Sequence, residues 1–280
     1  MRWKGRQQSG NVEDRRGMSS GKMAAGGTLG TLAIVVIVWL LGGNPSQLIN
    51  NLQSNNESGV VDSAVIQAEE ELAQFASVVL KDTEDVWHEL FRQSGKAYKE
   101  PILVIFSGSV ESACGYSSSA TGPFYCPGDN KLYIDLSFLE DLQQQLGAHG
   151  DFAMAYIIAH EVGHHVQNQL GLTDQLNQLR GRVGETEYNR NLVKLELQAD
   201  FLAGVWAHHA QRTKNILESG DIEEAINAAA AVGDDRIQMQ SQGYVVPDAF
   251  THGTSEQRKA WFTKGFTTGD IEQGDTFSEN

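Results

Sequence analysis

The chain has 280 residues, of which 40% are hydrophobic and 20% are charged, and it contains two cysteines. These values exclude a disordered acidic protein, which buries too little apolar surface, and a miniprotein held together by several disulfides. We therefore expect one domain of enzyme size with appended segments.

The net charge of −15 is unevenly distributed along the chain. Residues 1–22 hold six lysines and arginines against two acidic residues, which leaves 15 basic and 34 acidic residues, a net charge of −19, for the rest. A body this acidic repels polyanions, so we expect no nucleic-acid partner. Residues 1–22 are interpreted as a basic cytoplasmic tail.

An uncharged stretch with an apolar centre at 29–41 follows the basic residues. Residues 23–43 supply about the ~20 positions that a helix needs to span a bilayer. Because the basic residues come first, the positive-inside rule places the N-terminus in the cytoplasm and the main domain outside it. This predicts a single-pass membrane protein with a signal-anchor helix at 23–43.

Three other interpretations of the apolar stretch stay open. A cleaved signal peptide has the same layout, although residues 40–44 contain no convincing A-x-A-like cleavage site. The pair Arg15-Arg16 is a feature of twin-arginine export signals, but the residues after it are a poor match. A buried helix of a soluble protein also fits the apolar run, although the basic flank argues against it.

Composition divides the remainder of the chain into three parts. Residues 44–60 are rich in Asn, Ser and Gly, which predicts a linker. The main domain is then expected at 61–270, and a short C-terminal tail at 271–280.

Periodicity within the domain predicts few strands early and helices late. Apolar residues at helical spacing indicate a long helix over 62–93. The apolar run 102–106 and the alternating segment 131–136 indicate two strands. Further helices are expected at roughly 151–170, 186–212, 221–241 and 254–268. This order favours an α+β domain over alternating βαβ units.

The two cysteines, Cys114 and Cys126, flank a short loop. If the domain lies outside the cytoplasm, they are free to form a disulfide, which contributes about 3 kcal/mol on the chain-entropy model. Zinc ligation by this pair is disfavoured, because their spacing matches no common paired-thiolate motif. A structural disulfide is the preferred interpretation.

Residues 160–164 read His-Glu-Val-Gly-His, an H-E-x-x-H motif that follows the apolar run 152–159. The run predicts a largely buried helix, and the i,i+4 spacing puts His160 and His164 on one face, where both can bind one metal ion. Glu161 can then reach the open coordination position. Two core histidines satisfied by backbone carbonyls are the alternative, but metal ligation explains several ionisable groups in an apolar helix together.

A catalytic zinc site has three protein ligands and one water molecule, so the motif needs a third ligand. Glu196 and Asp200 lie one helical turn apart in an apolar segment, where carboxylates are costly to bury unless they are paired or bind metal. We predict Glu196 as the third ligand. Asp200 would accept a hydrogen bond from the distal nitrogen of His160 or His164. The alternative is that both acids face water.

The combination of H-E-V-G-H-H with E-L-Q-A-D at 196–200 resembles the signature of gluzincin metallopeptidases. Closer still, the chain resembles the bacterial neutral zinc metallopeptidase family, membrane-anchored proteins with a C-G…G-P-F-Y-C-P loop before the active-site helix, here at 114–127. The resemblance runs from about residue 60 to residue 269. It implies a zincin-like α+β fold, a Zn²⁺ cofactor, protein or peptide substrates and a bacterial cell membrane location. The domain would be periplasmic in a Gram-negative organism.

Residues 251–258, T-H-G-T-S-E-Q-R, resemble the T-H-P-x-x-x-x-R segment of CAAX-prenyl-endopeptidase-like gluzincins. In those relatives the histidine and the arginine lie beside the zinc and help to stabilise the transition state, which implies catalytic roles for His252 and Arg258. Gly253 stands where the relatives usually have proline, which puts the shape of the local turn in doubt. The ordinary alternative for Arg258 is a surface position on a helix capped by the preceding Thr or Ser.

These residues predict a zinc metalloendopeptidase in which a zinc-activated water cleaves the peptide bond and Glu161 moves the proton. By resemblance to zincins, the strand at 131–136 is the expected edge strand for an extended substrate. The alternative function is a catalytically inactive envelope scaffold or adaptor that keeps the zinc site. A third interpretation, a soluble helical protein whose histidines and acids are on the surface, predicts no bound metal.

Overall fold

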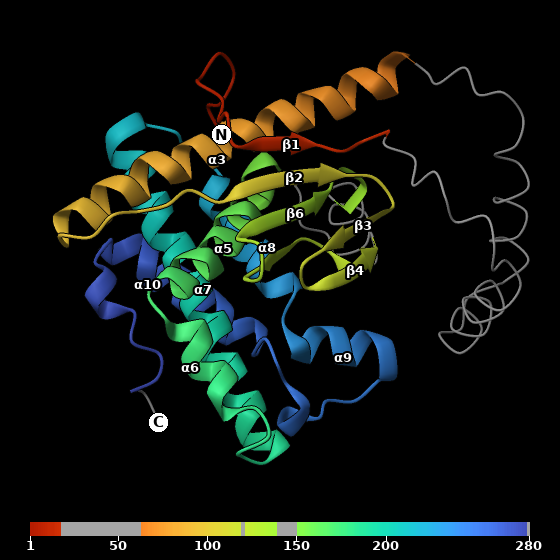
Figure 1. Ribbon diagram of the computed structural model, residues 1–280, viewed down its shortest axis with the longest axis vertical. Helices are drawn as coiled ribbons and strands as arrows, with labels where there is room; N and C mark the ends of the chain where they lie inside the picture. Colours follow the sequence, from red (N-terminus) through yellow and green to blue (C-terminus); the bar gives the residue numbers. More distant parts are fainter. Residues whose placement is uncertain (18–62, 119–120, 139–149, 279–280) are drawn as a thin grey trace, which may run out of the picture. The chain divides into compact units, whose positions relative to one another are not determined.

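The computed structural model describes residues 1–17, 63–118, 121–138 and 150–278. Within these residues the protein is a mixed α+β domain, mostly helical, with a small sheet (Figure 1). This agrees with the α+β fold class predicted from the sequence. The transmembrane helix predicted at 23–43 lies outside the described residues. Among the helices that are described, none is long and apolar enough to cross a bilayer.

The main sheet has four strands in the order β1-β2-β6-β5. Both β1 and β6 run parallel to β2, whereas β5 is antiparallel to β6 and forms the edge. The strand bounds are Val12–Asp14 for β1, Ile102–Phe106 for β2, Phe124–Cys126 for β5 and Lys131–Asp135 for β6. The predicted strands at 102–106 and 131–136 are confirmed. β1 and β5 were not predicted, because three residues are too few to show an alternation.

The two faces of the sheet pack against different partners. Leu103, Ile105 and Ile134 join the main core, which includes buried residues of α3 (Ser63–Gln93) and α5 (Asp151–Gln169). The opposite face forms a smaller cluster of Val104, Phe106, Val110, Cys126 and Tyr133. Val110 belongs to a separate hairpin of β3 (Ser109–Ser112) and β4 (Gly115–Ser118). Residues 103–106 of β2 are all buried, because β2 lies between these two hydrophobic layers.

Residues 1–16 are part of this domain. β1 pairs with β2, with Val12 opposite Leu103, and the Met1 side chain is buried in the main core. Two basic residues of this segment form ion pairs with acids elsewhere in the domain, Lys4 with Glu71 and Arg6 with Asp82. Residues 1–22 are interpreted from the sequence as a separate cytoplasmic tail. For residues 1–16 this is wrong, because β1 pairs with β2 and charged residues of the segment form ion pairs with the domain.

This pairing also constrains membrane topology. Paired strands lie about 4.8 Å apart, whereas the hydrocarbon core of a bilayer is about 30 Å thick. Residues 1–16 and the rest of the domain must therefore lie on the same side of any membrane. The predicted orientation, with a cytoplasmic N-terminus and an extracytoplasmic domain, is incompatible with a sheet that contains both β1 and β2.

Six α-helices that lie wholly within the described residues follow the sheet, and two of them meet at very short range. They are α5, α6 (Leu172–Leu179), α7 (Glu185–Lys214), α8 (Asp221–Ala231), α9 (Asp234–Gln242) and α10 (Ser255–Thr268). A Cβ added at Gly204 of α7 would lie 2.2 Å from the carbonyl oxygen of Phe262, and one at Gly265 of α10 would lie 2.0 Å from that of Phe201. Both positions therefore require glycine, and they let α10 bring its side chains close to α7.

Two sequence expectations fail in this region. The helix predicted over 221–241 is two helices, α8 and α9, separated at Gly233, where an added Cβ would lie 2.4 Å from the backbone nitrogen of Ser255. The C-terminal tail predicted from residue 271 packs on the domain through residue 278. Thr276 is 3% exposed, and its hydroxyl donates to the carbonyl oxygen of Lys194 at 2.7 Å.

Candidate metal centre

Helix α5 carries the H-E-x-x-H motif on a buried segment. His160 is 7% exposed, and the apolar residues before it are buried on all sides of the helix. Gly163 lies where α7 crosses, since an added Cβ would lie 3.0 Å from the carbonyl oxygen of Ala199. The glycine inside the motif thereby lets α7 approach and brings Glu196 beside the two histidines.

The three predicted ligands converge in the structure. His160 Nε2 lies 3.2 Å from Glu196 Oε2, and His164 Nε2 lies 3.4 Å from Glu196 Oε1. One ligand atom from each residue falls within 4.8 Å of the others. Ligand atoms about 2.0–2.1 Å from a tetrahedral zinc ion are roughly 3.3 Å apart. The spacing and the chemistry of these donors therefore fit zinc.

The charges of the site favour a cation between these side chains. Burial by itself lowers the pKa of His160, but the carboxylates of Asp200 and Glu196 raise it to about 10. Burial would raise the pKa of Glu196, yet His164 and His160 hold it well below its usual value. Protons on the imidazoles or a bound metal ion can supply the positive charge that the two carboxylates require.

Each histidine is oriented by a hydrogen bond to its other ring nitrogen. His160 Nδ1 lies 2.9 Å from Asp200 Oδ1, as predicted for one of the two histidines, and His164 Nδ1 lies 2.9 Å from Gln167 Oε1. Donation from Nδ1–H to these oxygens leaves both Nε2 atoms free to bind metal. No pattern in the sequence pointed to Gln167, whose role depends on the packing of α5 against α7.

Asp200 lies at the centre of a fully buried polar network. Its side chain is 0% exposed and accepts hydrogen bonds from the Tyr156 hydroxyl at 2.5 Å and from Arg258 Nε and Nη2 at 2.8 and 2.9 Å. The remaining Arg258 nitrogen donates to the Val232 carbonyl oxygen. Arg258 therefore positions Asp200, and it also lines the cleft over the metal centre, so its predicted contact with the transition state stays a prediction.

His252 lies beside the metal centre and is oriented by a residue that the sequence did not reveal. Asp234, the first residue of α9, accepts the backbone N–H groups of Thr251, His252 and Gly253 at 2.8, 2.6 and 3.0 Å. Its other oxygen lies 3.2 Å from His252 Nδ1. The hydrogen bond that His252 makes to Asp234 raises the pKa of the ring, although partial burial acts to lower it. The ring is 50% exposed, so it can reach a ligand.

The turn after His252 differs from that of the relatives with proline. Gly253 has φ +89°, whereas proline is restricted to φ near −65°. The substitution noted in the sequence is therefore a real difference in backbone shape. His252 nevertheless lines the same cavity as His160, His164 and Glu196.

A cleft of about 560 Å³ opens over the metal centre. Glu161 lies in it, close to the backbone of Tyr125. Burial raises the pKa of Glu161, although His164 and His160 act in the opposite direction. A carboxylate with a raised pKa beside a metal centre is suited to accept and return a proton.

The edge strand beside this cleft is β5, which carries Tyr125. The expectation that residues 131–136 form the edge is wrong, because β6 is paired on both sides, with β2 and with β5. The sequence could not show this, since the order of strands depends on the short strand at 124–126.

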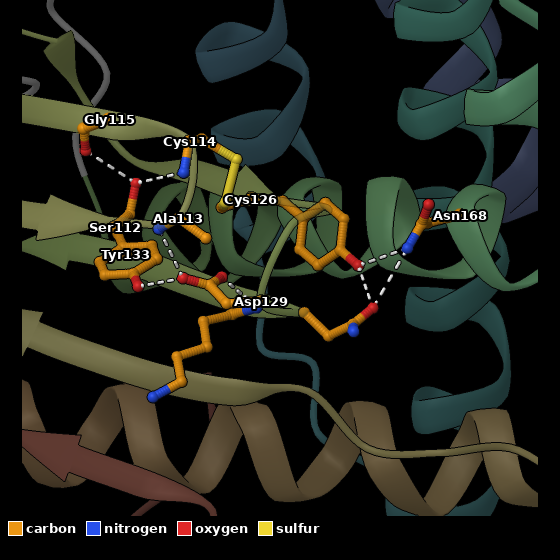
Figure 2. The surroundings of a disulfide bond; sticks show 11 residues. Ser112, Ala113, Cys114, Gly115, Cys126, Asp129, Tyr133 and Asn168 are labelled. Carbon is orange, nitrogen blue, oxygen red and sulfur yellow. Dashed lines mark hydrogen bonds between the residues drawn. A yellow bond between two sulfur atoms is a disulfide. The ribbon is translucent and has the colours of Figure 1, made fainter. Parts of the chain in front are cut away.

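The disulfide predicted between Cys114 and Cys126 is present and holds one end of β5 (Figure 2). Asn168 of α5 donates to the Tyr125 hydroxyl at 3.0 Å and to Asn130 Oδ1 at 3.1 Å. His165 Nδ1 also lies 3.1 Å from the Tyr125 hydroxyl, so this histidine supports β5 and does not join the metal centre. The disulfide and α5 thus hold the edge strand in place over Glu161.

The motif on α5, the carboxylate ligand on α7 and the aspartate behind it define a site of the zinc metallopeptidase class. The chain belongs to the family described as "Putative neutral zinc metallopeptidase", whose family model matches residues 1–277. Zinc is the metal that this family implies, and the group of His160, His164 and Glu196 could hold it. The match includes residues 1–16, in agreement with their place in the domain.

Two relatives illustrate the similarity. The chain is 47% identical to the uncharacterized protein YpfJ of Escherichia coli over 289 residues, covering all of both chains. It is 46% identical to the uncharacterized protein Rv2575 of Mycobacterium tuberculosis over 192 residues, which cover 65% of this chain and 64% of that one. No solved structure matches the chain.

Proposed function

We propose that this protein is a zinc-dependent metalloendopeptidase that hydrolyses peptide bonds of protein substrates. The observation that carries the proposal is that three zinc-type ligands and an acidic side chain, Glu161, share one cleft beside an edge strand. A metal site with a purely structural role is normally closed by a fourth protein ligand, whereas a catalytic site keeps one position open. Among the described residues, the metal cluster offers three ligands.

Zinc bound at this centre would acidify a water molecule and polarise the carbonyl group of the peptide bond. Glu161 would accept the proton of that water as it attacks the carbonyl carbon, and would then deliver the proton to the leaving amine nitrogen. The raised pKa of Glu161 favours the first of these transfers, because it makes the carboxylate a stronger base.

His252 would donate a hydrogen bond from its exposed ring nitrogen to the oxygen on which negative charge develops. The hydrogen bond from Nδ1 to Asp234 fixes the ring and favours its protonated form. Asp200 and Arg258 would act behind the ligands by holding the His160 ring in place.

An extended polypeptide would be bound by β-strand pairing at the free edge of β5. In the register with β6, Tyr125 lies opposite Leu132, and both Tyr125 and Glu161 line the cleft. A substrate strand laid along this edge would place its backbone beside the metal centre. Pairing of this kind recognises the backbone, so protein substrates of varied sequence are expected.

We also propose that the domain lies outside the cytoplasm, because its disulfide is stable in an oxidising compartment. In that case residues 1–16 lie outside the cytoplasm as well. Residues 23–43 lie outside the described residues, and one membrane-spanning helix there would put β1 and β2 on opposite sides of the membrane, so the single-pass anchor is not part of this proposal.

The proposal is tested by cleavage of a denatured protein such as casein with the zinc-loaded, full-length chain. We expect cleavage that a chelator abolishes and that zinc restores. The Glu161→Gln variant should keep its zinc and lose hydrolysis, because only the proton carrier is removed. Full zinc occupancy with no cleavage would refute the proposal and favour the scaffold. Turnover of Glu161→Gln like that of the wild type would refute the role of Glu161.

A further inference from the structure

The cleft over the metal centre is lined by apolar side chains from separate parts of the chain. Ile157 belongs to α5, one turn before Glu161, and Phe138 follows β6. Val232 and Ile237 come from the end of α8 and from α9. The cleft therefore offers apolar contacts in addition to the polar edge of β5.

Charged groups in the described lining of the cleft are already engaged. Glu161 and Glu196 belong to the metal centre, Arg258 is ion-paired with Asp200, and His252 is paired with Asp234. A charged substrate side chain would thus find no free partner of opposite charge among the described lining residues. Because burying an unpaired charge is costly, the cleft favours an apolar side chain.

Ile237 is the most exposed of the apolar lining residues. Its side chain is 43% exposed on α9, a helix in which Asp234 is the buried residue. Asp234 fixes the start of α9 beside His252, and Ile237 lies about one turn further along. An isoleucine in this position contributes little to the core. An apolar side chain bound in the cleft would cover the exposed surface of Ile237 and remove that surface from water.

Met239 provides a natural comparison on the same helix. It is 52% exposed, similar to Ile237, but it does not line the cleft. Two residues along an α-helix, side chains point about 200° apart. Exposure alone is therefore shared by the two residues, and contact with the cleft is specific to Ile237.

We propose that the enzyme selects extended polypeptide segments with a large apolar side chain next to the cleaved bond, and that Ile237 determines this specificity. The inference rests on the proposed peptidase function and names its substrate class. Side chains of this kind are buried in folded proteins, and a folded chain cannot pair along β5. The substrates are accordingly unfolded or loosely folded protein segments.

The experiment uses two series of fluorogenic peptides. In each series one position carries Leu, Phe, Ala, Lys or Asp; this position comes directly before the cleaved bond in one series and directly after it in the other. The zinc-loaded, full-length enzyme should cleave the Leu and Phe peptides with a kcat/KM at least about 10-fold above that of the Lys and Asp peptides. Ile237→Ala should lower kcat/KM for the Leu and Phe peptides by about 10-fold and leave the Ala peptide little changed. Met239→Ala should match the wild type.

Zinc content and the urea unfolding midpoint are measured for each variant, so that misfolding is distinguished from altered specificity. Binding of the same peptides to the zinc-loaded Glu161→Gln variant should follow the same order. Equal cleavage of charged and apolar peptides, or equal effects of Ile237→Ala and Met239→Ala, would overturn the inference while leaving the peptidase intact. If the zinc-loaded wild type cleaves none of the peptides and no denatured protein, the proposed function fails, and the inference fails with it.

Discussion

Replacing Arg258 by methionine should destabilise the domain strongly, because Arg258 is the charge partner of a fully buried carboxylate. Arg258 is 3% exposed and Asp200 is 0% exposed, and two guanidinium nitrogens contact the two carboxylate oxygens at 2.8 and 2.9 Å. Methionine retains much of the apolar stem but removes every one of these donors. Asp200 is then left with Tyr156 and His160 as partners.

Breaking a buried ion pair by removing one partner typically costs about 3–5 kcal/mol. For a domain of this size, that loss corresponds to a fall in Tm of roughly 10 °C. The matched control is Lys259→Met on the same helix. Lys259 pairs with Glu256, whose side chain is 83% exposed, and a surface pair of this kind contributes about 0–1 kcal/mol.

The assay is urea unfolding at neutral pH with a chelator present, so that metal binding does not contribute to the difference. We expect Arg258→Met to lower the free energy of unfolding by about 3–5 kcal/mol and Lys259→Met by less than about 1 kcal/mol. Equal effects of the two substitutions, or a loss below about 1 kcal/mol for Arg258→Met, would refute the assignment of Arg258 as the buried partner of Asp200.

Four further outcomes are expected. His252→Ala should lower kcat by about 10²–10³ with zinc content unchanged, and a smaller than threefold loss would remove His252 from the mechanism. Asp234 raises the pKa of His252, so the protonated ring persists to higher pH; Asp234→Asn should move the alkaline limb of the kcat profile to lower pH, and an unmoved limb would exclude this coupling. Cys114→Ser should cost about 3 kcal/mol in urea unfolding, and an unchanged midpoint under oxidising conditions would contradict it. Single cysteines at the exposed positions Gln8 and Lys96 should react with an impermeant thiol reagent from the same side of the cell membrane, whereas labelling from opposite sides would contradict the placement of β1.

The metal ligands could be predicted from the sequence because their signals are local. The i,i+4 spacing of His160 and His164 and the one-turn spacing of Glu196 and Asp200 are properties of single helices. Two carboxylates in an apolar helix required a partner, and the structure supplies it through α5 and Arg258.

Residues whose roles depend on tertiary packing could not be predicted in the same way. Asp234 contacts His252 at a sequence separation of 18 and carries no motif of its own. Gln167 orients His164 only because α7 lies against α5. Tyr125 lines the cleft with Glu161 because β5 is an edge strand of the sheet, and three residues give too short a pattern to show this.

The N-terminal segment shows how a strong local signal can mislead. A basic cluster before an apolar stretch is typical of a cytoplasmic tail and a signal anchor. Arg6 and Lys131, however, form ion pairs that join β1 and its flanks to the domain, with Asp82 and Glu13 as their partners. Sequence composition shows how many charges a segment carries, but it does not show which acidic residues lie beside those charges in the fold.

His160, His164 and Glu196 are assigned as the ligands of one zinc ion. The most direct measurement is elemental analysis of the purified full-length chain beside the His164→Ala variant, each after reconstitution with zinc and removal of excess metal. We predict close to one zinc per chain in the wild type and a large loss in the variant. A wild-type chain that retains no zinc after reconstitution, or a variant that retains as much as the wild type, would contradict the assignment of this centre.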